Sequence, residues 1–228
     1  MTNWFLRAKH WQLFILIFAV PIVIEMVAFV TVFATHEIAM VFVFMFVIMA
    51  LVMGVQFGWF YNVGTALGKK LPENAGMNLK RFRSFVITPV IYFCFIFISM
   101  IVFGTFLFSG GRPSPFFGLG FLIIVPLHLF SMFCIFYTYW FIAKSLKMVE
   151  KWNHVEFGDY IGEFFLLWFF PVGVWFIQPR INRLFDPTLP PQVPPSYSNP
   201  FQQPNLSGQF PDQYPGQNSG NGPIYPPK

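Results

Sequence analysis

Charge is scarce in this 228-residue sequence: Asp, Glu, Lys and Arg make up 10% of it, whereas hydrophobic residues make up 56%. Soluble domains carry about 25% charged residues, so the composition excludes an ordinary water-soluble globular protein. The formal net charge is +5, but the basic residues flank apolar runs and form no stripe. This placement argues against a nucleic-acid partner.

Cysteine is also rare, and recognisable cofactor motifs are missing. The two cysteines, Cys94 and Cys134, lie inside apolar runs, where we expect small buried hydrophobic side chains and no disulfide. The sequence contains no glycine-rich phosphate loop and no cluster with metal-ligand spacing. We therefore expect no cofactor, no metal and no catalytic residues, which favours a protein that is not an enzyme.

The sequence contains long apolar runs. Four runs are long enough, at about 1.5 Å rise per residue, to cross a hydrocarbon core of about 30 Å. We predict an all-α polytopic membrane protein whose four transmembrane helices form two antiparallel hairpins. The predicted spans are residues 11–33, 38–61, 85–108 and 121–143, after a short basic N-terminal segment of residues 1–10.

The first run has a basic start, as a signal peptide does. We favour a membrane span because the run is too long for a signal peptide and no small-residue cleavage site follows it.

A polar segment, residues 62–84, joins the second and third predicted spans. Four of its residues predict that no continuous helix crosses it: Gly64, Gly68, Pro72 and Gly76.

The distribution of basic residues predicts the orientation. Of the 14 Lys and Arg residues, all but Arg112 fall on the side that holds residues 62–84. Because Lys and Arg concentrate in cytoplasmic loops, both termini are predicted to be cytoplasmic. The turns Thr35–Glu37 and Ser109–Gly120 are then external.

Residues 144–185 are predicted to form a juxtamembrane helix, a glycine-containing break and a short apolar element. The apolar run Phe164–Ile177 would reach only about 21 Å as a helix, which favours an interfacial or re-entrant element. A short fifth span is the rival interpretation. It would place Arg180 and Arg183 outside, against the charge distribution.

The C-terminal segment, residues 186–228, is dominated by Pro, Gln, Asn, Ser and Gly. Such a composition predicts a disordered tail with polyproline II character. Within it, Pro194, Pro195 and Tyr197 belong to a Pro-Pro-Ser-Tyr stretch that fits the pattern bound by WW domains. Because matches of this kind arise by chance in a proline-rich tail, a solvated spacer is the competing interpretation.

Two segments carry a resemblance. Asp159–Phe185, together with the Lys-Lys-Leu-Pro stretch of Lys69–Pro72, resembles a group of uncharacterised bacterial multi-pass, four-helix membrane proteins. The resemblance implies a multi-pass protein of the bacterial cell (inner) membrane. It implies no functional residue.

Glu25 and His128 form the candidate intramembrane polar site. A carboxylate inside a span costs about 2.5–3.5 kcal/mol on insertion scales and normally has a partner. His128 lies in the fourth predicted span at a matching depth below the external boundary. Pro21 and Pro126 precede the two residues and can free backbone carbonyls beside them. A proton-relay or substrate site is one interpretation, and a structural pair or a protonated Glu25 is the other.

Gln56, in the second span, is predicted to form hydrogen bonds between helices. Thr88 and Ser99, in the third span, are predicted to bond to their own helix backbone.

The leading functional hypothesis is a non-enzymatic membrane interaction or scaffold protein. The alternative is a small transporter or channel component that uses Glu25 and His128. A distant alternative is an intramembrane enzyme, since Ser131 lies one turn from His128, but no acid or oxyanion donor is identifiable nearby. The expected partners are the lipid bilayer, proteins that bind the tail, and further copies of the chain.

Overall fold

The computed structural model describes residues 4–36, 39–71, 75–108, 110, 117–151 and 155–189. No strand occurs in that part of the chain, which confirms the all-α prediction. The helices are α1 (Trp4–Arg7), α2 (His10–Phe14), the π-helix η1 (Ile15–Ala19), α3 (Val20–Thr35), α4 (Ala39–Lys70), α5 (Leu79–Phe108), α6 (Phe117–Lys151), α7 (Phe157–Trp168) and α8 (Phe170–Leu184).

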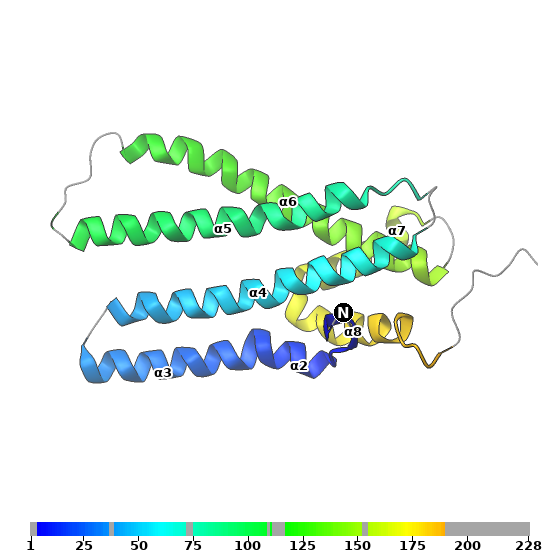
Figure 1. The fold of residues 1–228 in the computed structure, drawn as a ribbon, viewed down its shortest axis with the longest axis horizontal. Coiled ribbons are helices and arrows are strands. Elements are labelled where there is room, and N and C mark those ends of the chain that lie inside the picture. Colours follow the sequence, from blue (N-terminus) through cyan, green and yellow to red (C-terminus); the bar gives the residue numbers. More distant parts are fainter. Residues whose placement is uncertain are drawn as a thin grey trace, which may run out of the picture. The chain divides into compact units, whose positions relative to one another are not determined.

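Four stretches of these helices are long and apolar enough to cross a membrane: His10–Thr35, Val43–Lys70, Leu79–Gly104 and Leu122–Lys151. They form two hairpins, α3 with α4 and α5 with α6, and α4 packs on both α5 and α6 (Figure 1). Four transmembrane helices in two antiparallel hairpins were predicted, and this architecture is confirmed.

The first span contains one irregular turn. The Val20 N–H donates to the Ile15 carbonyl, five residues back, which makes Ile15–Ala19 a π-helix. Pro21 follows directly; it lacks an N–H, and its ring crowds the carbonyl four residues earlier. Such π turns inside long helices accommodate a local break in the regular bonding without ending the helix.

The predicted break across residues 62–84 is wrong in extent, because α4 continues to Lys70 and α5 begins at Leu79. Packing explains the difference. Val63 and Leu67 on the extended part of α4 are fully buried. A Cβ at Gly64 would lie 2.1 Å from the ring of Phe82, which is itself fully buried. Glycine here allows the ring to lie against α4, and this burial outweighs the helix cost of about 1 kcal/mol per glycine.

The run Phe164–Ile177 is divided between two helices. The chain reverses at Phe169, so α7 and α8 form a helical hairpin, and neither helix is among the four candidate spans. Pro171 lies in the first turn of α8, where its missing N–H costs nothing. A Cβ at Gly173 would lie 1.7 Å from the Leu166 carbonyl oxygen. Glycine is therefore required where the two helices touch.

We define the basic half as α1, α2, α7, α8 and the parts of α4, α5 and α6 that lead to Lys70, Leu79 and Lys151. Most of the fully buried side chains lie there. The turn of the α7–α8 hairpin exposes large apolar side chains, among them Trp168, Phe169 and Val172. An exposed patch of this kind is typical of a surface that contacts a membrane or another protein. The prediction of an interfacial or re-entrant element stays a prediction.

The opposite half consists of the parts of α3–α6 that lead to Thr35, Ala39, Phe108 and Phe117. Large apolar side chains there are mostly exposed, as in Phe29, Phe33 and Leu122.

Candidate functional site

Glu25 lies in the middle of α3, and its side chain is exposed. Its neighbours Met26 and Phe29 are 66% and 73% exposed, so the carboxyl group lies on a surface made of apolar side chains. Within the described residues it makes no hydrogen bond and no ion pair. A carboxyl group inside a membrane span normally has a partner, so its absence among the described residues makes Glu25 a candidate for a contact outside them.

His128, on α6, is also exposed but has a partner. Its Nδ1 lies 2.9 Å from the hydroxyl of Tyr92 on α5. When the Tyr92 hydroxyl donates to Nδ1, the neutral ring carries its proton on Nε2. The Nε2–H is then a donor available to an acceptor outside the α5–α6 hairpin.

The structure does not bring Glu25 and His128 together within one chain. α3 packs on α4, whereas α6 packs on α4, α5 and α7. In Figure 1, α4 and α5 lie between α3 and the beginning of α6. Their depths do agree: Glu25 precedes Thr35 by ten residues and His128 follows Phe117 by eleven, about 15 and 16 Å at helical rise.

The remaining predicted residues have mixed outcomes. Gln56 is half-buried on α4, and no hydrogen bond joins it to another helix in the described part of the chain. Thr88 and Ser99 donate to the carbonyls of Ser84 and Phe95, as predicted.

The two cysteines differ in their exposure. Cys134 is buried, but Cys94 is exposed, so the expectation of a buried side chain is wrong for Cys94. Pro194, Pro195 and Tyr197 lie outside the described residues. No group of three or more potential metal ligands occurs within the described residues.

Gln178 on α8, which the sequence prediction missed, is an amide that joins separate helices within the described residues. Its side chain is fully buried. Its Oε1 accepts from the Trp59 indole N–H at 2.6 Å, and its Nε2 lies 2.9 Å from the carbonyls of Phe5 and Ala8. Asn182, one turn later, also donates to the Ala8 carbonyl at 3.0 Å. Gln178 thereby ties the N-terminal segment, α4 and α8 together.

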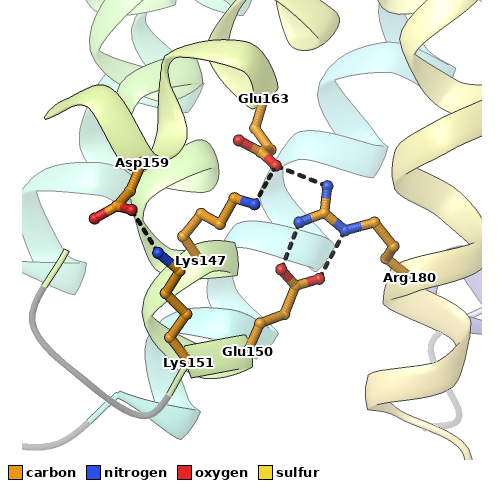
Figure 2. Close-up of polar contacts among 6 residues, drawn as sticks. All are labelled: Lys147, Glu150, Lys151, Asp159, Glu163 and Arg180. Atoms are coloured by element: carbon orange, nitrogen blue, oxygen red, sulfur yellow. Dashed lines mark hydrogen bonds and ion pairs between the residues drawn. The ribbon is translucent and has the colours of Figure 1, made fainter. Parts of the chain in front are cut away.

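A second polar cluster joins α6, α7 and α8 (Figure 2). Arg180 donates through Nε and Nη2 to the Glu150 carboxylate, at 2.7 and 2.5 Å, and through Nη1 to Glu163 at 2.9 Å. Lys147 Nζ lies 2.8 Å from the same Glu163 oxygen, and Lys151 pairs with Asp159. Three cations thus face three carboxylates.

The balance of charge sets the protonation of this cluster. Burial alone would raise the pKa of Glu163, but hydrogen bonds from Lys147 and Arg180 outweigh it and hold the pKa below its ordinary value of 4.5. Hydrogen bonds to Glu150 raise the pKa of Arg180. Glu163 and Arg180 are therefore both charged at neutral pH, and the bonds that they make to Lys147 and Glu150 hold α6, α7 and α8 in place.

The spacing of Gln178 and Asn182 in the sequence is a weak indication that both amides are buried between helices. They lie four residues apart, directly after an apolar run, on the helix face that carries Ile177, Ile181 and Leu184. Four-residue spacing puts them on one buried stripe.

No protein-family model, no curated protein and no solved structure matches this chain. The resemblance carried by Asp159–Phe185 therefore stays an expectation, and function must be argued from the residues.

Proposed function

We propose that this protein is a non-enzymatic membrane protein that assembles with further copies of itself in the bilayer. In this assembly Glu25 of one copy pairs with His128 of the next. The observation that supports it is the exposed carboxyl group of Glu25, which has no partner among the described residues. A partner contributed by another chain would offset the cost of about 2.5–3.5 kcal/mol that a lipid-facing carboxyl group imposes.

The chemistry of His128 fits this role. With Nδ1 engaged by Tyr92, Nε2–H can donate to a carboxylate that arrives from outside the chain. The matching depths of the two residues allow the copies to share one orientation in the membrane. Two copies related by a two-fold axis along the membrane normal would make this contact twice and form a dimer, whereas copies that each make it once on either side would form a ring or an array.

The orientation is part of the proposal. The basic half lies on the cytoplasmic side of a bacterial cell membrane, because Lys and Arg concentrate there. A cysteine at His36 should then react with a membrane-impermeant thiol reagent on intact cells, whereas one at Lys80 should not. Reaction at Lys80 without permeabilisation would reverse the orientation. The proline-rich tail, as a cytoplasmic site for protein partners, rests on the sequence alone.

Crosslinking between two tagged chains tests the assembly. In a background with Cys94→Ala and Cys134→Ala, one chain carries Glu25→Cys and the other His128→Cys. Oxidation of membranes that contain both should yield a disulfide-linked heterodimer.

Met26→Cys replaces Glu25→Cys in the matched control. Met26 follows Glu25 directly in the sequence, but its side chain points about 100° away around the helix. The yield of disulfide-linked heterodimer should therefore fall at least severalfold. Equal products from both positions, or none from either, would rule out the Glu25–His128 contact.

A small transporter remains the second candidate, since the same pair would place two ionisable groups at mid-membrane depth between copies. Glu25→Gln separates the two functions. A scaffold should keep its oligomeric state in the variant, because an amide still accepts from Nε2–H. A proton-coupled transporter would lose pH-dependent flux in vesicles at unchanged assembly.

A further inference from the structure

A groove of about 390 Å³ lies between α4 and α5. Met53, Gly54 and Tyr61 line it from α4, and Val90, Cys94 and Phe97 line it from α5. Its walls are almost wholly apolar. A Cβ at Gly54 would meet no atom within 4 Å, so space remains open above that residue. The volume falls in the range of about 300–1,000 Å³ typical of small-molecule sites.

The groove extends over one half of the span. On α4 it runs from Ala50 to Tyr61, about 16 Å at helical rise. This length is about half of a hydrocarbon core of about 30 Å, so the groove matches a single leaflet. Tyr61 marks the end nearer Lys70, in the basic half.

Two unsatisfied polar atoms lie just beyond that end. The Thr65 hydroxyl oxygen and Arg83 Nε are buried and have no hydrogen-bond partner within the described residues. Thr65 follows Tyr61 by four residues, and Arg83 precedes Ile87 by four, so each continues the groove-lining face of its own helix. Leaving such groups unpaired costs about 1–3 kcal/mol each.

We propose that the groove binds one acyl chain of an anionic phospholipid from the leaflet at the basic half, and that its phosphate accepts hydrogen bonds from Arg83 and Thr65. Arginine is suited to a phosphate because its planar guanidinium offers paired donors. The exposed Lys69 and Lys80 flank the same end and attract anionic headgroups to it. The lipid site shares no residue with the Glu25–His128 contact, so an experiment can support or contradict it independently of the proposed function.

Photocrosslinking of lipid to the full-length protein tests the site. The probes are phosphatidylglycerol and phosphatidylcholine, each with a photoreactive group in the acyl chain, in vesicles of otherwise identical composition. Phosphatidylglycerol should label peptides that contain residues 50–61 and 86–97 about fivefold more than phosphatidylcholine does. Equal labelling by the two lipids would overturn the proposal.

Two pairs of variants separate the headgroup from the chain. Arg83→Gln should remove the preference for phosphatidylglycerol, and Arg83→Lys should restore part of it. Arg183→Gln, which removes an exposed cation from α8 outside the groove, should leave the preference nearly unchanged. Gly54→Phe should fill the groove and abolish labelling by both lipids, whereas Gly104→Phe, at an equally open position outside the groove, should not.

Three further results would contradict the proposal. One is an unchanged preference in Arg83→Gln, and another is labelling that persists in Gly54→Phe. The third is a disulfide formed through Cys94 between two chains, with no lipid labelling, which would assign the groove to a second copy.

Discussion

The basic half and the opposite half of this protein are held together in different ways. In the basic half, Trp59, Phe60 and Phe82 are fully buried, and Gln178 and Arg180 join helices that are far apart in sequence. In the opposite half, α3 has one buried side chain, Ala28, and Glu25 is exposed.

The difference matters because lipid tails are as apolar as the helices. Helices in a bilayer gain little from hydrophobic burial, and close packing and hydrogen bonds decide which of them associate. The basic half has both within the chain. Among its described residues the opposite half has fewer buried side chains and fewer bonds between helices. Its exposed apolar side chains are suited to contact with lipid or another chain, and the acid on α3 lies among them.

Matched Phe→Ala substitutions test this contrast most strongly. Phe60 is 1% exposed and contacts the rings of Trp59, Tyr139 and Phe170, with centroids 5.3–5.6 Å away. Phe60→Ala should lower the free energy of unfolding by about 3–5 kcal/mol, because a large cavity remains.

Phe46 is the counterpart in the opposite half. It is half-buried and packs on Phe97 at 4.9 Å. Phe46→Ala should cost about 1 kcal/mol, the value of one aromatic pair. Equilibrium unfolding in detergent measures both, and equal losses would remove the contrast between the halves.

Substitution at the α7–α8 contact should have the next largest effect. Gly173→Ala places a methyl group on the Leu166 carbonyl, and helices cannot separate there without losing the packing of Phe170 and Val174. We expect a loss of about 2–3 kcal/mol in unfolding free energy.

Gly162→Ala in α7 is its control, because a Cβ there meets no atom within 4 Å. Alanine should stabilise that helix by about 0.5–1 kcal/mol. A Gly173→Ala variant as stable as Gly162→Ala would mean that α7 and α8 are less closely packed than described.

The sequence predicted the spans well because length and hydropathy are local properties. The four runs needed no knowledge of their neighbours, and the basic residues of α4, α5 and α6 collect at one end as predicted. The continuation of α4 through Gly64 was not predictable in this way. It depends on Phe82, which contacts it only after the chain has turned.

The polar contacts were harder to predict for the same reason. Arg180 and Glu150 are 30 residues apart, and Trp59 and Gln178 are 119 apart. Matching depth indicated that Glu25 and His128 belong to one layer of the membrane. It could not indicate whether α3 and α6 are neighbours, because depth along a helix says nothing about position within the bilayer plane.

The smallest expected effect is the pH dependence of the basic half. The pKa of Glu163 is lowered in the folded protein by Lys147 and Arg180, below its ordinary value of 4.5. The unfolded chain therefore binds this proton first as the pH falls, and the stabilisation by Glu163 is complete above about pH 4.5 and lost as the pH falls through the folded pKa. We expect the loss to be on the order of 1 kcal/mol, since two charge-assisted hydrogen bonds weaken in a partly solvated cluster.

Glu163→Gln should be less stable than the natural protein at pH 7, and the difference should shrink on acidification. Thermal unfolding of both proteins between pH 7 and pH 3 measures it, and a difference that stays constant over that range would show that the charge of Glu163 contributes nothing to the α6–α7–α8 contact.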